Sequence, residues 1–297
     1  MSRSRRSTTR TKAGPFFEPA PTESIDVGHD LVDVPIRYYR TDCFLGIFAA
    51  DHDAVAELLP SDRLFPVRLK GGRAAIGVVA YNYSETGVGP YGEIGIAALC
   101  TFDRAAKPMV PLLRETADPR FGAFVLHLPV TSRIARDAGR TIWGYPKFVA
   151  DMTFDLRPER RSVEMCEQGR ELLGLEVRNH GKFLRDNKPV VTFSEQRGQM
   201  VRTVVATRAE YRTKVGHGNG RLELGDHEVA QQLRELDIST DAMATKYYLS
   251  HAAVLPKGET LCPADEAYEG FAGSDAPFGR HVIRYDEGVE TIVSEAA

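Results

Sequence analysis

The sequence has little cysteine and no clustered metal ligands. Its four cysteines, Cys43, Cys100, Cys166 and Cys262, lie far apart and form no Cys-x-x-Cys pair, so neither a zinc site nor a disulfide framework is predicted. None of the eight histidines belongs to a His-x-x-x-His pattern, so we predict no bound metal. Unpaired cysteines suit a reducing compartment, and we expect a cytoplasmic protein.

Long apolar runs and a strong net charge are also missing. No apolar stretch approaches the roughly 20 residues that span a bilayer, so we predict no membrane segment. The net charge of −3 argues against a general affinity for nucleic acid or for an anionic membrane. Residues 1–13 carry five basic residues and no acid, as a transit peptide or a nucleic-acid arm would, but they have no apolar face. We interpret residues 1–25 as a disordered basic leader.

The rest of the 297-residue chain is rich in short β-prone runs, and its length suits one large β-rich domain. Such runs recur between charged turns at 31–48, 74–83, 121–130, 152–156, 162–166, 172–177, 189–193, 200–213 and 243–255, with a final strand predicted at 282–285. Helical patterns are few, at 51–59, at 131–138 and in a segment that ends at Leu236. This order predicts an α+β, mostly β fold with an antiparallel β-barrel or sandwich core.

A glycine-rich turn follows the run at 74–83. Gly87, Gly89 and Gly92 satisfy the Gly-x-Gly-x-x-Gly spacing of dinucleotide-binding proteins. That motif requires a helix whose N-terminus holds the pyrophosphate, and the sequence after Gly92 is strand-like. We therefore predict a hairpin rather than a nicotinamide or flavin site, and no cofactor.

The stretch from Gly139 to Asp151 contains an unusually placed lysine. Lys147 follows Pro146, and its neighbours in sequence include Trp143, Tyr145 and Phe148. An apolar setting disfavours the ammonium form, and a neutral amine is a nucleophile. The alternative is a lysine whose stem lies on Trp143 while its ammonium reaches water.

This stretch resembles the Schiff-base lysine segment of acetoacetate decarboxylase and its superfamily, in Gly139-Arg140 and in Tyr145-Pro146-Lys147. Acetoacetate decarboxylase is itself a standard example of a lysine activated by desolvation or by a second cation. The segments 51–60 and 220–227 also resemble the family, so the similarity extends from about residue 31 to 256. It implies an acetoacetate decarboxylase-like domain over residues 26–258, followed by a C-terminal extension over 259–297.

The resemblance also implies site residues. Gly89, Tyr91 and Glu93 match a Gly-x-Tyr-x-Glu sequence that carries an active-site glutamate, which implies that Glu93 acts with Lys147. A solvated loop charge is the alternative for Glu93. The chain departs from the family at two positions. Val78 stands where the family has a second glutamate, and Phe148 stands where the decarboxylase has a second lysine. The implied substrate-binding residues are Arg40, Val78, Trp143, Tyr145 and Phe148, with Arg40 as the ligand of a carboxylate. His227 lies at a predicted helix start, where we interpret it as a capping or packing residue.

An imine on Lys147 would act as an electron sink, which supports several reactions. The resemblance implies a lyase that decarboxylates a 3-oxo acid bulkier than acetoacetate. An aldolase or dehydratase acting on pyruvate-type 2-oxo acids is the alternative with the same chemistry. A non-catalytic barrel that binds small ligands, with Lys147 paired to a carboxylate, is the alternative from another class. The family also implies a homo-oligomer.

Overall fold

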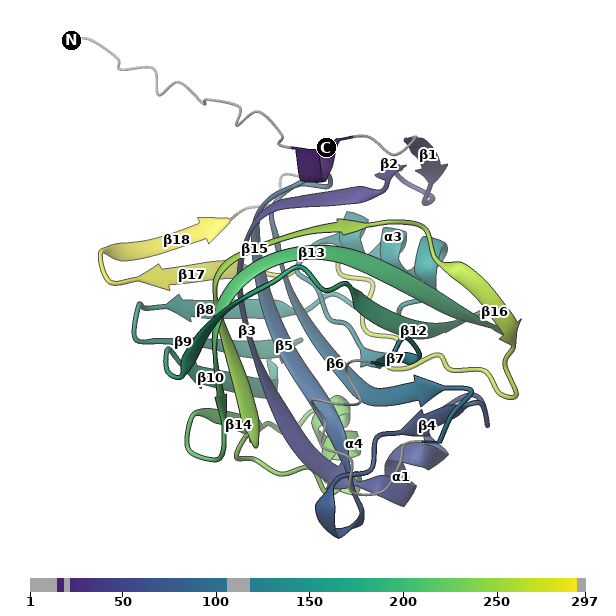
Figure 1. Ribbon diagram of the computed structural model, residues 1–297. Helices are drawn as coiled ribbons and strands as arrows, with labels where there is room; N and C mark the ends of the chain where they lie inside the picture. The colour runs from purple at the N-terminus through teal and green to yellow at the C-terminus, as the bar shows by residue number, and fades with distance from the viewer. Residues whose placement is uncertain (1–14, 19–21, 106–117, 293–297) are drawn as a thin grey trace, which may run out of the picture.

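Seven long strands close into a β-barrel (Figure 1). The computed structural model describes residues 15–18, 22–105 and 118–292. The strands are joined in the order β12-β7-β6-β5-β3-β15-β13, and β13 pairs back with β12. All of these pairs are antiparallel except the short β7–β12 pair. Their bounds are β3 Ile36–Asp51, β5 Arg73–Thr86, β6 Tyr91–Phe102, β7 Phe121–His127, β12 Val190–Gln196, β13 Gln199–Val215 and β15 Ala244–Leu255. The predicted mostly β barrel class is confirmed.

A second, six-stranded sheet packs on the outside of the barrel (Figure 1). Its order is β14-β10-β9-β8-β17-β18, with bounds β14 Gly220–Leu224, β10 Arg170–Arg178, β9 Arg160–Glu167, β8 Asp151–Leu156, β17 His281–Tyr285 and β18 Gly288–Ile292. The strand predicted at 282–285 is therefore β17, but it is not the final strand because β18 follows it. Short strands β4 (Leu64–Pro66), β11 (Lys182–Asp186) and β16 (Glu259–Pro263) extend the barrel edges.

Successive side chains along the barrel strands alternate between the two faces of the barrel wall, and this alternation separates two hydrophobic clusters. On β5 and β6, Val78 and Ile94 face outward into the core shared with the six-stranded sheet. Tyr83 and Tyr91, at the intervening odd positions, belong to a separate cluster inside the barrel. Because successive strand residues point to opposite faces, the odd-numbered residues of these two strands line the barrel interior.

Three α-helices are present in the described part of the chain. Helix α1 (His52–Glu57) lies within the predicted range 51–59 and begins after Asp51, whose side chain caps it. Helix α3 (Arg133–Trp143) begins at Ser132 and covers one end of the barrel interior (Figure 1). It extends five residues beyond the predicted end at 138, because the chain leaves the helix only at Gly144, which has φ 66°. Helix α4 (Glu228–Glu235) ends at Leu236, as predicted.

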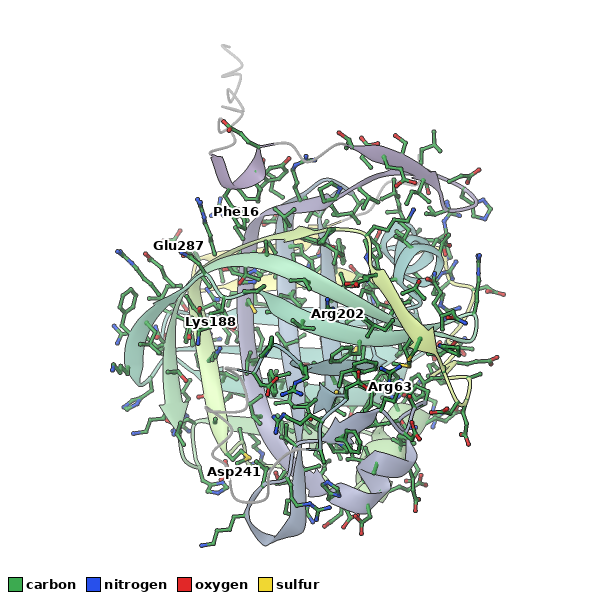
Figure 2. All side chains as sticks on the ribbon, turned by 45° about the vertical axis from the view of Figure 1, so that its right-hand side comes forward. Phe16, Arg63, Lys188, Arg202, Asp241 and Glu287 are labelled. Carbon is green, nitrogen blue, oxygen red and sulfur yellow. The ribbon has the colours of Figure 1, made fainter. Side chains whose placement is uncertain are left out.

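Both ends of the chain contribute contacts. A 3₁₀ turn, η1 (Pro15–Phe17), lies beside the barrel, where the guanidinium of Arg208 is 4.6 Å from the Phe16 ring centre (Figure 2). Strands β1 (Glu23–Asp26) and β2 (Leu31–Val34) form a hairpin, so β-structure begins inside the range interpreted as the leader. The remaining leader residues 1–14 and 19–21 lie outside the described residues. None of the helices in the described part is long and apolar enough to cross a membrane.

The predicted C-terminal extension lies against the lysine stretch. Gly270 and Gly273 lie so close to Pro146 and Phe148 that neither glycine has room for a side chain. The hydroxyl of Tyr268 donates to the backbone oxygen of Leu126 at 2.9 Å. These contacts make the extension part of the layer behind Lys147.

Candidate active site

The centre of the candidate site is a buried ion pair. The Nζ atom of Lys147 lies 2.6 Å from Oε2 of Glu93. Lys147 is 4% exposed and Glu93 is 6% exposed. Neither side chain reaches bulk solvent. The alternatives that placed the Lys147 ammonium and the Glu93 carboxylate in water are therefore wrong.

The backbone around Lys147 is held from several sides. The backbone N–H groups of Leu128 and Val130 donate to the carbonyl oxygens of Pro146 and Phe148, at 3.1 and 2.8 Å. Arg140 donates from its guanidinium to the carbonyl oxygen of Lys147. The segment thus runs beside residues 128–130, which follow β7, with Lys147 directed to Glu93 and Phe148 to the outer core.

Gly139 makes room for the lysine stem. A Cβ atom at position 139 would lie 2.4 Å from Cδ and 2.6 Å from Cε of Lys147, which is far inside van der Waals contact. The Gly139-Arg140 part of the stretch therefore has two local tasks. The glycine leaves space for the side chain, and the arginine holds the backbone.

Three tyrosines surround the carboxylate, and the sequence did not identify their role. Tyr83 donates to Oε1 of Glu93 at 3.3 Å, and Tyr91 donates to Oε2 at 3.4 Å. Tyr38 lies 3.2 Å from the Tyr91 hydroxyl. Burial, reinforced by the charge of Glu93, raises the pKa of all three phenols, so they remain protonated donors at neutral pH. The alternation of Tyr81 and Tyr83 with polar residues was the available signal.

Trp143 and Tyr145 lie in the same buried interior cluster as the three tyrosines. Their rings stack with centres 6.0 Å apart. The indole N–H of Trp143 donates to the backbone oxygen of Pro256 at 2.8 Å, and the Tyr145 hydroxyl lies 2.7 Å from the Thr192 hydroxyl. Burial raises the pKa of Tyr145 to about 12. Both residues form the wall beside the ion pair.

The other three predicted substrate-binding residues are not brought to the pair. Val78 is buried in the outer core, on the opposite face of the barrel wall from Glu93. Phe148 points away from Lys147 and stacks on His227 with ring centres 6.3 Å apart. Arg40 is exposed on β3 and, among the described residues, makes no hydrogen bond or ion pair with either member of the pair. Val78 is at an even position of β5, whereas the odd positions of that strand, such as Tyr81, share the face of Glu93.

Other residues that the sequence analysis considered have structural roles. His227 caps α4, and its Nδ1 accepts from the backbone N–H of Val229 at 3.1 Å, which confirms the capping interpretation. Gly87 and Gly89 lie in the β5–β6 turn, and strand β6 rather than a helix follows, as predicted. Within residues 15–18, 22–105 and 118–292, no group of three or more His, Cys, Asp or Glu side chains is arranged to hold a metal.

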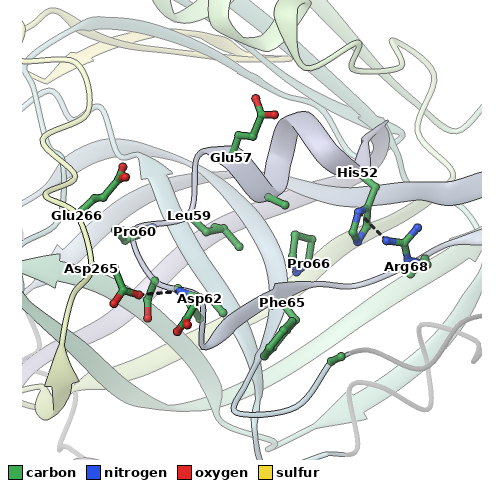
Figure 3. A pocket seen from close by; sticks show the side chains of 14 residues that line it. His52, Glu57, Leu59, Pro60, Asp62, Phe65, Pro66, Arg68, Asp265 and Glu266 are labelled. Atoms are coloured by element: carbon green, nitrogen blue, oxygen red, sulfur yellow. Dashed lines mark hydrogen bonds between the residues drawn. The ribbon is translucent and has the colours of Figure 1, made fainter.

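A surface pocket of about 500 Å³ lies elsewhere, between α1, β4 and Asp265–Glu266 (Figure 3). His52 and Arg68 meet on one side of it at 3.0 Å, and the backbone N–H of Asp62 donates to Asp265 on the other. Neither Lys147 nor Glu93 lines this pocket. It is therefore separate from the ion pair.

The chain is similar to known proteins in sequence profile and in fold. The sequence profile of the acetoacetate decarboxylase family matches residues 20–261. Acetoacetate decarboxylase from Legionella pneumophila superposes with a TM-score of 0.61 at 17% identity, over 84% of this chain and 94% of that one. The enduracididine biosynthesis enzyme MppR, complexed with the condensation product of pyruvate and imidazole 4-carboxaldehyde, gives 0.58 at 16% identity, over 78% and 90%. An acetoacetate decarboxylase-like enzyme from Sphingomonas wittichii gives 0.52 at 18%, over 77% and 94%. No curated protein matches the sequence significantly.

Proposed function

Since this chain belongs to the acetoacetate decarboxylase family, we propose that it is a carbon–carbon lyase whose Lys147 forms an imine with an oxo acid. The observation that carries the proposal is the buried contact of 2.6 Å between Lys147 and Glu93. A lysine removed from water, with a proton acceptor in direct contact, has what a nucleophilic amine requires.

Glu93 would move the protons of imine formation. It accepts a proton from the Lys147 ammonium, and the free amine adds to the oxo carbon of the substrate. The carboxylic acid then returns its proton to the hydroxyl group, which leaves as water and produces the iminium. Tyr83 and Tyr91 hold the carboxylate in place through their hydrogen bonds.

The iminium would then promote loss of carbon dioxide from a 3-oxo acid. The electron pair of the bond to the carboxylate moves toward the iminium nitrogen, which leaves an enamine. Glu93, after it takes up a proton from water, would protonate the enamine carbon and form the iminium of the product. Water then adds to the iminium carbon, the ketone leaves, and Lys147 is restored. We propose a 3-oxo acid bulkier than acetoacetate as the substrate.

An aldolase or dehydratase reaction on a pyruvate-type 2-oxo acid is the second candidate. Two findings favour it. The fold neighbour MppR has been observed with pyruvate and with a pyruvate condensation product. In addition, Glu93 is the only carboxylate that contacts Lys147 among the described residues, and removal of a proton from the carbon next to the iminium requires one base.

The test is reduction with borohydride in the presence of acetoacetate or pyruvate, followed by intact-mass spectrometry. The wild type should gain the mass of the reduced adduct, and Lys147→Ala should not. Lys257→Ala is the matched control, because Lys257 is exposed and pairs only with Glu23 at the surface. A folded wild type that gives no adduct with any oxo acid would refute imine chemistry and favour a non-catalytic binding barrel.

The products distinguish the two reactions. Release of carbon dioxide from a 3-oxo acid supports the decarboxylase, and formation of an unsaturated condensation product from pyruvate and an aldehyde supports the alternative. We also propose a homo-oligomer in the cytoplasm, which light scattering after size-exclusion chromatography and cell fractionation would test.

A further inference from the structure

A second polar cluster lies on the interior wall of the barrel across from the ion pair. Cross-strand pairing runs from Glu93 on β6 to Tyr81 on β5 and then to Cys43 on β3. On the far side, Tyr248 of β15 pairs with Tyr211 of β13. Because paired residues point to the same face of a sheet, all of these side chains face the interior.

His251 also belongs to this cluster. Its ring centre lies 5.7 Å from that of Tyr81 and 5.4 Å from that of Tyr248. Its Nδ1 atom is buried and has no hydrogen-bond partner among the described residues. The hydroxyl groups of Tyr81 and Tyr248 also make no hydrogen bond to another described residue. Burial lowers the pKa of His251 to about 4 and raises the pKa of both phenols. The three groups are therefore neutral at pH 7, and both phenols can donate.

Lys246 adds a positive charge beside these groups. It lies two residues before Tyr248 on the same strand face, and its Nζ is 4.5 Å from the ring centre of Tyr211. No hydrogen bond or ion pair of Lys246 exists within the described residues, although Asp186 attracts it from a greater distance. Burial lowers the pKa of Lys246. An interior lysine without an anionic partner is costly to bury, and a bound anion would offset that cost.

The interior wall beside Lys246 is partly accessible. Lys246 pairs with Leu45, and Leu45 pairs with Val79, so these three residues also face the interior. Each of them keeps part of its surface accessible. The next residue in this row, on β6, is Gly95, and Val79 and Leu128 pack over it. A ligand would therefore contact this row on the accessible surfaces of Lys246, Leu45 and Val79.

We propose that Lys246, Tyr81, Tyr248 and His251 form a distal subsite that binds a second acidic group of the substrate. The inference rests on the proposed imine at Lys147 for the oxo end of the molecule. It identifies the substrate class as an oxo acid with a distal carboxylate. Glu93 and Lys246 lie three strands apart, roughly 14 Å along the wall at about 4.8 Å per strand. This distance follows the wall, and the side chains at both ends reach into the interior, so a short carbon chain between the oxo carbon and the distal carboxylate can connect the two groups.

The test compares 3-oxoadipate with 3-oxohexanoate, which has the same number of carbon atoms but ends in a methyl group. For the wild type, we expect kcat/KM for decarboxylation to be at least tenfold higher with 3-oxoadipate. Lys246→Met should lower this ratio at least tenfold. Lys182→Met is the matched control, because Lys182 is an exposed lysine on the edge strand β11. It should keep the wild-type ratio.

Binding to Lys147→Ala separates this proposal from the proposed reaction, because this variant cannot form an imine. Calorimetry should show at least tenfold tighter binding of 3-oxoadipate than of 3-oxohexanoate, whether or not the wild type is a decarboxylase. Equal affinities would overturn the distal subsite. A preference that persists in Lys246→Met, in a protein whose circular dichroism matches the wild type, would overturn the role of Lys246. Absence of any borohydride adduct would instead refute the imine chemistry alone.

Discussion

Substitution of Gly139 by alanine should disable Lys147 without unfolding the protein. The added Cβ would lie 2.4 Å from Cδ of Lys147, whereas favourable carbon–carbon separations are about 3.5–4.0 Å. The lysine side chain must therefore move by about 1 Å or more, and the 2.6 Å contact of Nζ with Glu93 would be lost. A displacement of this size can reduce a catalysed rate about 100-fold.

The stability of Gly139→Ala should change much less. Alanine is favoured over glycine inside a helix by about 1 kcal/mol, and Gly139 lies within α3. Overpacking costs about 1–3 kcal/mol, because part of the strain is relieved when the flexible lysine moves. The two effects oppose each other, and the ion pair is displaced rather than deleted, so the net loss in unfolding free energy should stay below the roughly 3–5 kcal/mol that removing one partner of a buried pair costs.

The assay is the rate of borohydride-trapped adduct formation, measured together with urea unfolding. Gly174→Ala is the matched control, because a Cβ at that strand position would meet its nearest atom at an ordinary 3.7 Å. We expect the control to trap substrate at the wild-type rate and Gly139→Ala to do so about 100-fold more slowly. Trapping by Gly139→Ala at the wild-type rate would refute the role assigned to the position of the lysine stem.

Three further predictions concern stability. Glu93→Gln leaves the Lys147 charge buried without its partner and should lower the unfolding free energy by about 3–5 kcal/mol. Adding Lys147→Met to this variant should restore part of the lost stability. A double-mutant cycle that shows no coupling energy between the two positions would contradict this prediction. Tyr268→Phe removes the hydrogen bond to Leu126 and should cost about 1 kcal/mol in urea unfolding; an unchanged midpoint would show that the extension contributes little there. Burial lowers the pKa of His281 to about 4, so the unfolded chain binds more protons below pH 6.5 and stability falls as the pH drops toward 4. By pH 5 this histidine should cost roughly 2 kcal/mol, and His281→Phe should show a smaller difference between urea midpoints at pH 7.5 and 5.

Short sequence patterns predicted those helices and strands whose boundaries depend on neighbouring residues. Asp51 and the apolar residues after it predicted α1, and the capping residue does what its type suggests. The end of α3 was predicted too early, because Gly139 resembles a helix terminator. Its real role is to leave space for Lys147, a residue that contacts it only after the chain has turned at Gly144.

The candidate site was predictable only in part. The stretch around Lys147 and the Gly-x-Tyr-x-Glu sequence named both members of the ion pair, and the structure brings them together across 54 positions. Val78 was chosen by spacing along the chain, but the structure places it on the other face of the wall. Tyr38 and Lys246 come from strands distant in sequence, and nothing in their local sequence connects them to Lys147.

The sequence by itself determined most of the long strands and the location of the three described helices, the β class of the fold, and the chemical types that meet at the ion pair. Those properties follow from side-chain alternation, capping and short motifs, which act over a few residues. The tertiary structure decided which face each strand presents to the barrel interior and which distant side chains share it. Barrel closure and strand register control that choice, and both depend on pairings between residues far apart in the chain.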